Sequence, residues 1–149
     1  MTAFVTGGDA EHGADGGVSM IHQPGTLTVE VEDQREHGRI LTIGGEVDIL
    51  TAPQLARALD LAVAAHPSRI LADLSGVLYM GAAGLTVLLR AHAAAGPHTV
   101  FAVIANGAAA RPLRVTDVDS AFAVYPNRET ALACTAAMLT PVSMRSEPS

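Results

Sequence analysis

The segment at residues 70–74 constrains the fold most, because four of its five residues are apolar. Such a run is typical of a strand that is covered on both faces, as in the centre of a parallel sheet. A glycine-containing turn follows at residues 81–84. After the turn, one face of an amphipathic pattern carries Leu85, Leu88, Leu89 and His92. We therefore expect a buried strand, a turn and a helix that begins within two residues of Ala83.

Periodic patterns on both sides of this unit predict an α/β layer. Residues 27–31 alternate between apolar and polar, as in a half-buried strand, and a hairpin would connect them to a strand at residues 40–44. Helical patterns follow at about residues 51–65, 109–116 and 127–138, and strand patterns at 99–105 and 122–125. This order predicts a four- to five-stranded mixed sheet with about four helices packed mainly on one side.

The length and the composition favour one domain. The chain has 149 residues, which is enough for one core but not for two. Residues 1–25 and 140–149 lack periodicity and are rich in small, polar or proline residues. We expect a flexible N-terminal tail at 1–25, a domain at 26–139 and a flexible C-terminal tail at 140–149.

Charge and residue types argue against several functions. The net charge is −6 and no basic stripe exists, which argues against a nucleic-acid partner. All nine basic residues are arginine, so the lysine of a phosphate-binding P-loop is absent. The six histidines and one cysteine have no metal-ligand spacing, and we expect no metal or cofactor. The acidic balance either suits a basic partner surface or simply keeps the protein soluble.

The sequence also predicts where the protein works. The longest nearly uncharged apolar run, residues 74–89, is short and interrupted by glycine, so we expect no membrane span. No basic residue precedes Arg35, so the cationic region of a signal peptide is missing. Cys134 is the single cysteine, which fits a reducing compartment. We expect a cytoplasmic protein.

Several polar side chains have ordinary structural interpretations. Thr51 would cap the first helix with its hydroxyl. Asp73 would accept turn N–H groups, and Ser75 is a turn serine rather than a nucleophile. His92 is interpreted as a hydrogen-bonded histidine at the edge of the core, and Cys134 as a buried, inert thiol rather than a reactive one. No arrangement of these residues supports an enzyme.

Four blocks in order resemble the anti-sigma factor antagonists, the bacterial STAS-domain proteins. They lie at residues 44–55, 73–77, 79–85 and 110–126. In that family the turn usually reads apolar-Asp-Ser-Ser-Gly-Leu, and a kinase phosphorylates the first serine. Here Gly81 takes the place of the aspartate, and Ala82 and Ala83 take the places of the serines. The resemblance therefore implies the STAS fold without the phosphorylation site.

The resemblance implies a non-catalytic domain that binds an anti-sigma factor of the serine-kinase type and so regulates sigma-factor-dependent transcription. The implied partner-binding residues are Asp48, Thr51, Met80, Gly81, Ala82, Ala83 and Gly84. No phosphorylation is expected, because the family position is Ala82. Thr86 is either a displaced acceptor or an ordinary surface threonine. The alternative is an oligomerisation or scaffold module that pairs with other STAS proteins or with itself, and an eroded turn without a partner also stays open.

Overall fold

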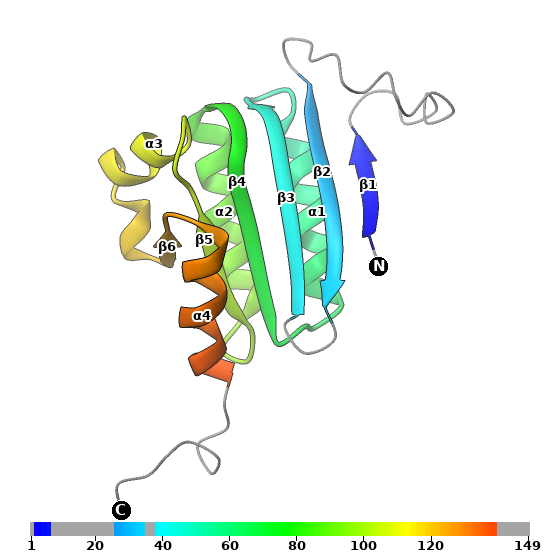
Figure 1. Cartoon of the computed structure of the whole chain (residues 1–149). Helices are drawn as coiled ribbons and strands as arrows, with labels where there is room; N and C mark the ends of the chain where they lie inside the picture. The colour runs from blue at the N-terminus through cyan, green and yellow to red at the C-terminus, as the bar shows by residue number, and fades with distance from the viewer. Residues whose placement is uncertain (1, 7–25, 35–37, 140–149) are drawn as a thin grey trace, which may run out of the picture.

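The computed structural model describes residues 2–6, 26–34 and 38–139. Within them, six strands form one mixed sheet in the order β1-β2-β3-β4-β5-β6 (Figure 1). The first three strands are antiparallel neighbours, and β3 to β6 are parallel. Their bounds are β1 Thr2–Thr6, β2 Leu27–Gln34, β3 Gly38–Val47, β4 Arg69–Met80, β5 Val100–Ile104 and β6 Ala123–Tyr125.

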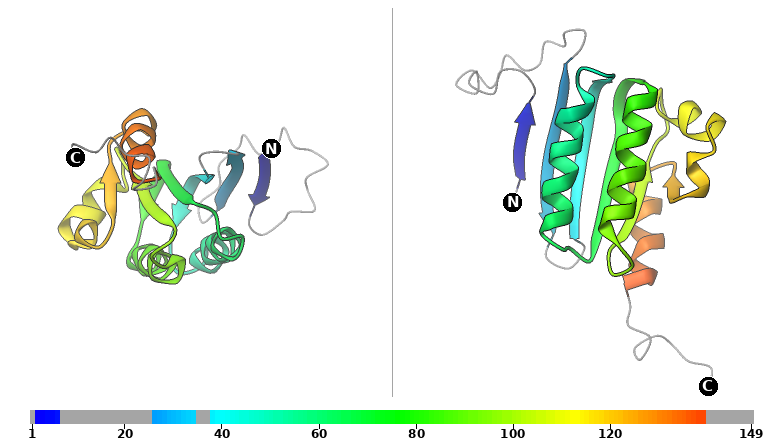
Figure 2. Two further views of the ribbon diagram at one scale, coloured as in Figure 1. Left: turned by 90° about the horizontal axis from the view of Figure 1, so that it is seen from below. Right: turned by 180° about the vertical axis from the view of Figure 1, so that it is seen from behind.

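The helices lie on both faces of the sheet. They are α1 Ala52–Ala64, α2 Ala82–Ala95, α3 Ala110–Val115, the 3₁₀ turn η2 Val118–Ser120, and α4 Arg128–Leu139. α1 and α2 lie side by side on one face, and α4 packs on the other (Figure 2). The predicted mixed α/β sheet is confirmed. The helices were expected mainly on one side of the sheet, and α1 and α2 do share one face. α4 packs on the opposite face, against β5 and β4.

β4 lies at the centre of the core. It pairs with β3 on one side and with β5 on the other, and residues 70–74 are all buried. This confirms the interior strand that the apolar run predicts. Side chains on one face of the sheet, among them Leu41 and Ile43, share the main core cluster with Leu55 of α1 and Leu88 of α2. A smaller cluster on the other face packs Ile40 and Leu71 against Ala131 of α4.

The N-terminus differs from the sequence prediction. Thr2–Thr6 forms β1, which pairs with β2 from Thr6 opposite Thr28 to Thr2 opposite Glu32. An edge strand takes its hydrogen bonds from its neighbour, and that neighbour is more than twenty residues away in sequence. The local pattern therefore gave no signal for it. The rest of the predicted N-terminal tail and the predicted C-terminal tail lie outside the described residues.

Two arginines connect α4 to the sheet. Arg69, at the start of β4, is fully buried, and its Nη1 donates to Thr135 Oγ1 (2.6 Å) and to the carbonyl oxygen of Leu132 (3.3 Å). Arg128, in the first turn of α4, donates from Nη2 to Asp73 Oδ2 (3.0 Å) and to Thr42 Oγ1 (2.8 Å). The start and the middle of the helix are thus hydrogen-bonded to β3 or β4.

Cys134 lies on the outer side of α4 and is exposed, so the prediction of a buried thiol was wrong. Ala131 and Thr135 face the sheet instead, and a cysteine one position before Thr135 is rotated by about 100° away from it. Asn127 caps this helix, since its Oδ1 accepts the N–H of Thr130 (2.7 Å). Within the described residues, no helix is long and apolar enough to cross a membrane.

Candidate functional site

The carboxyl ends of β3 and β4 bring the two predicted binding segments together. Val47 pairs with Met80 at the end of the parallel ladder, and the Gly81 N–H donates to the Val47 carbonyl oxygen (2.8 Å). The loop from β3 to α1 and the turn from β4 to α2 therefore adjoin at one edge of the sheet, the upper edge in Figure 1. Parallel strands produce this arrangement because both of their following loops leave the same edge.

Asp48 and Thr51 order the first of these loops. Asp48 Oδ1 accepts the N–H groups of Leu50 (2.9 Å) and Thr51 (3.0 Å). Because the Thr51 N–H stabilises the charged form, with a smaller contribution from Leu50, the pKa of the Asp48 carboxyl lies below its ordinary value. Within the described part of the chain, no group donates to Asp48 Oδ2. The loop thus presents an ionised carboxylate with one oxygen available.

Thr51 does not have the predicted role. It occupies the N-cap position of α1, but its hydroxyl makes no cap hydrogen bond. Instead Thr51 Oγ1 donates to the Glu46 carbonyl oxygen (2.7 Å) and accepts the N–H of Asp48 (2.9 Å). The side chain is buried, so Thr51 shapes the loop from within.

The turn before α2 divides its residues between the core and the surface. Gly81 is the N-cap in an extended conformation, and no side chain caps the helix. Ala82 is exposed and Ala83 is half-buried, whereas Met80 and Gly84 are buried. Met80 had been expected at the surface, and that prediction was wrong. A Cβ at position 84 would overlap Met80 Sδ and Val47 Cγ1, so the first turn of α2 packs directly on these side chains.

Two pairs of large apolar side chains are exposed in the segments next to this turn. Ile49 and Leu50 are 78% and 80% exposed, and Leu78 and Tyr79 are 62% and 54% exposed. We call these four residues the apolar rim. The register between β3 and β4 shifts between Gly45 and Glu46, so that β4 carries one extra residue before Tyr79. Such a bulge redirects side chains, and here it leaves Leu78 and Tyr79 both in solvent.

The apolar rim was not predicted from the sequence. Its only local signal is the adjacency of large apolar residues, Ile49-Leu50 and Leu78-Tyr79, where an alternating pattern would bury only one of each pair. Tyr79 also contacts the turn itself. A Cβ at position 81 would lie 3.2 Å from Tyr79 Oη and from Cε2 of its ring, so the ring lies close to the backbone of Gly81.

The remaining predicted side chains are placed as follows. Ser75 donates from its N–H (3.0 Å) and its hydroxyl (2.6 Å) to Asp73 Oδ1, as the turn interpretation predicted. His92 contacts the rings of Phe101 and Phe122, each with centroids 5.8 Å away. Its buried Nδ1 has no hydrogen-bond partner among the described residues, so the predicted hydrogen bond is not observed.

Two further residues lie on the outer surface of α2. Leu89 was expected on the inward stripe, but it is 37% exposed. Ala91 is buried in the core instead. The hydroxyl of Thr86 is exposed and donates to the carbonyl oxygen of Ala82 (3.2 Å), within its own helix.

Comparison with known proteins identifies the family. Residues 30–125 match the family described as "Mlab, STAS domain". The chain is a STAS domain. It is 34% identical over 110 residues to the anti-sigma-F factor antagonist RsfB of Mycobacterium tuberculosis (strain CDC 1551 / Oshkosh), an alignment that covers 73% of this chain and 89% of the relative. The family resemblance drawn from the four sequence blocks is therefore confirmed.

Solved structures agree with this assignment. An anti-sigma factor antagonist from Mycobacterium paratuberculosis superposes with a TM-score of 0.74 at 34% identity, over 78% of this STAS domain and 99% of that chain. A STAS domain protein from Planctomyces limnophilus superposes with a TM-score of 0.63 at 20% identity, over 72% and 97% of the two chains. The second likeness concerns the fold alone. The protein is thus a STAS domain related to anti-sigma factor antagonists.

Proposed function

We propose that this STAS domain is a non-catalytic, cytoplasmic protein that binds an anti-sigma factor of the serine-kinase type and so releases a sigma factor. The observation that carries the proposal is the apolar rim around the exposed Ala82, beside the ionised Asp48. The relatives named as anti-sigma factor antagonists support the choice of partner. The binding surface comprises Asp48, the apolar rim and the turn at residues 81–83.

The chemistry of this surface describes the partner. Contiguous exposed apolar side chains that are bordered by polar groups mark protein interaction sites. Tyr79 offers a large, rigid ring, a residue type enriched where interfaces gain most of their binding energy. Asp48 Oδ2 can accept a hydrogen bond from an arginine or lysine. The partner surface should therefore present apolar side chains with a cation at their border.

We further propose that this interaction is not controlled by phosphorylation at the turn. A phosphoserine at the start of a helix adds roughly −1.5 to −2 charges to a docking surface, which can repel a partner. Ala82 and Ala83 have no hydroxyl that could accept a phosphate. The domain would then be permanently able to bind, and its amount or another ligand would set its activity.

Calorimetric titration with a purified anti-sigma factor tests the surface. Ala82→Asp places a charge at the centre of the apolar rim, and we expect binding to weaken by about tenfold or more, since a buried unpaired charge is costly. Ala93→Asp is the matched control, because Ala93 is exposed on α2 about three turns further along. Equal affinities of wild type and Ala82→Asp would contradict the proposed surface.

Incubation with the same anti-sigma factor and ATP tests the absence of the switch. The intact mass of the wild type should stay unchanged. Ala82→Ser is the matched variant, which restores a hydroxyl without adding a side chain at position 81, where a Cβ would press on Tyr79. A gain of one phosphate on the wild type, mapped to Thr86 or Ser75, would contradict the proposal.

A further inference from the structure

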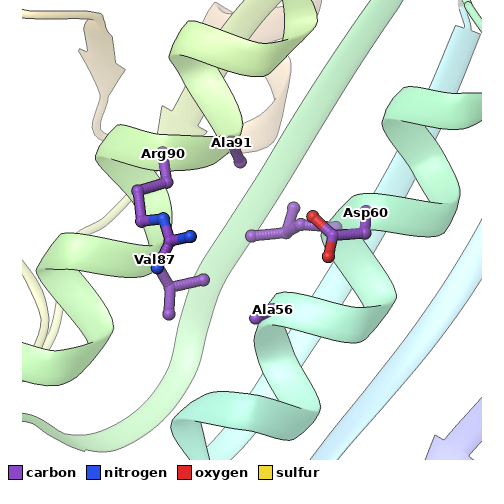
Figure 3. Close-up of a pocket in the computed structure, with 6 residues that line it drawn as sticks. Ala56, Asp60, Val87, Arg90 and Ala91 are labelled. Carbon is purple, nitrogen blue, oxygen red and sulfur yellow. The ribbon is translucent and has the colours of Figure 1, made fainter.

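A groove runs between α1 and α2 on the outer face of this helix pair. It is lined by Ala56, Leu59, Asp60, Val87, Arg90 and Ala91 (Figure 3). Leu59 and Ala91 are buried at its floor, and the small Ala56 leaves it open. Its volume is about 100 Å³, well below the roughly 300–1,000 Å³ of small-molecule sites. The groove is therefore too small for a ligand of ordinary size.

The two walls of the groove carry opposite charges. Asp60 of α1 and Arg90 of α2 are both exposed, and Figure 3 shows their charged groups directed into the groove from its two sides. No ion pair or hydrogen bond within the described chain joins them to each other or to a third residue. The groove thus has one acidic and one basic wall, each with its charge available to a second molecule.

We propose that this groove is a surface at which two copies of the chain associate. A twofold axis that lies in the contact plane and runs parallel to the helices places α1 of one copy over α2 of the other. Asp60 then faces the partner's Arg90, and Arg90 faces the partner's Asp60, so that one charge pattern forms two ion pairs. A twofold axis across the helices would instead bring like charges together, so the charges select the first arrangement.

The neighbouring side chains permit this contact. Ala56 lines the groove, and Ala64 and Ala93 are exposed on the two helices, so several short side chains lie near the charges. The larger Arg57, Leu61 and Leu89 are also exposed on these helices. Each helix is about 20 Å long, so the face measures roughly 20 by 20 Å, which is small beside the ~800 Å² per partner of stable complexes. The dimer should therefore be weak, reversible and sensitive to salt.

Charge reversal combined with sedimentation velocity tests this dimer. Wild-type protein should show concentration-dependent association. Asp60→Arg alone and Arg90→Asp alone should each weaken the association by about tenfold or more, because each brings like charges together. An equimolar mixture of the two variants should associate again, since one carries two cations at the groove and the other two acids. The double variant Asp60→Arg/Arg90→Asp should regain self-association.

Two matched controls change charge elsewhere on the surface. Asp119→Arg and Arg111→Asp change the net charge by the same amounts as the groove variants, at exposed residues of η2 and α3. Both should leave the association unchanged. Far-UV circular dichroism checks that every variant is folded. A wild type that is monomeric at all concentrations would overturn the proposal. So would groove variants that behave like the controls, or a mixture of single variants that stays monomeric.

The same variants separate this inference from the proposed function. The groove lies along the outer face of α1 and α2, whereas the anti-sigma surface lies at the edge of the sheet where these helices begin. Each single charge-reversal variant should therefore bind the anti-sigma factor as the wild type does. Loss of dimerisation with retained binding supports two independent surfaces. Parallel loss of both would show that the groove also belongs to the anti-sigma surface and would overturn the independence of the two surfaces.

Discussion

Gly84 is the residue at which α2 touches the ends of β3 and β4. There is no room for a Cβ, because Val47 Cγ1 and Met80 Sδ occupy the space. The close contact fixes the height of the first turn of α2 above the sheet. It therefore also positions the exposed Ala82 relative to the apolar rim, so one glycine links the core to the candidate binding surface.

Gly84→Ala should destabilise the domain by about 1–3 kcal/mol, because an added methyl group must displace buried neighbours. The midpoint and slope of urea unfolding measure this loss. Thr86→Ala is the control in the same helix, where an exposed side chain is shortened and the change should stay within about 0.5 kcal/mol. If both variants unfold at the wild-type midpoint, the packing of α2 at this glycine is looser than described.

Asp48→Asn tests the electrostatic contribution of the loop. The carboxylate has a pKa below its ordinary value of 3.8, so its stabilisation is present above that pH and is lost as the pH falls through the lower, folded-state pKa. At pH 7 the variant should unfold at a lower urea concentration than the wild type. As the pH falls through that folded-state pKa the two midpoints should converge, since the wild-type side chain then becomes neutral as well. A constant difference at all pH values would contradict this assignment.

At the scale of elements, α4 depends on two arginines rather than on an extensive apolar face. Asp73, which is nearly buried, accepts hydrogen bonds from both Nε (3.3 Å) and Nη2 (3.0 Å) of Arg128. The same guanidinium lies 3.4 Å from Glu32 Oε1 of β2. One side chain at the start of α4 thus contacts acids from β4 and β2.

Arg128→Ala should cost about 1–3 kcal/mol of stability, because it leaves a nearly buried carboxylate without its cation. Arg39→Ala is the matched control, since Arg39 pairs with the half-exposed Asp33 and such surface pairs contribute about 0–1 kcal/mol. Chemical denaturation of both variants gives the comparison. Equal losses in the free energy of unfolding for the two substitutions would contradict this prediction. So would an Asp73→Asn substitution that fails to raise the stability of the Arg128→Ala variant.

The elements show what the sequence could and could not predict. The apolar run at residues 70–74 and the start of α2 were predicted, because burial and helical spacing leave a local pattern. The sequence pattern did not predict that Leu78 and Tyr79 are exposed or that Met80 is buried. A bulge shifts the alternation of β4 by one residue, and that shift arises from pairing with β3. The hydroxyl of Thr51 likewise bonds to Glu46, which the capping pattern does not indicate.

At the scale of the whole molecule, the matched family region and the six-stranded sheet do not coincide. The family match spans residues 30–125, whereas β1 lies at Thr2–Thr6 and α4 extends to Leu139. β1 pairs with β2 alone, at the edge of the sheet. β2, by contrast, contributes the buried Leu27 and Val29 to the core.

A chain that begins at residue 26 should therefore remain a cooperative domain, with a thermal midpoint at most a few degrees below that of the full chain. Among the described residues before residue 26, the truncation removes only the edge strand β1, and cross-strand pairs contribute roughly 0.2–1 kcal/mol each. A chain that begins at residue 33 is the control, because it also loses Leu27 and Val29 and should not fold. Differential scanning calorimetry measures the unfolding transition of each truncated chain. A cooperative transition in both of them would contradict the described core.

The contacts of Arg69 bear on how the protein is made. Its guanidinium donates hydrogen bonds to Leu132 and Thr135, which lie more than sixty residues later in the chain. Synthesis proceeds from the N-terminus, so the ribosome releases β4 well before it releases α4. Until then this buried cation lacks both of those acceptors, and the central strand cannot reach its final environment. A growing chain should thus gain native stability late, when the last helix emerges, and a premature stop before α4 should mark the product for degradation.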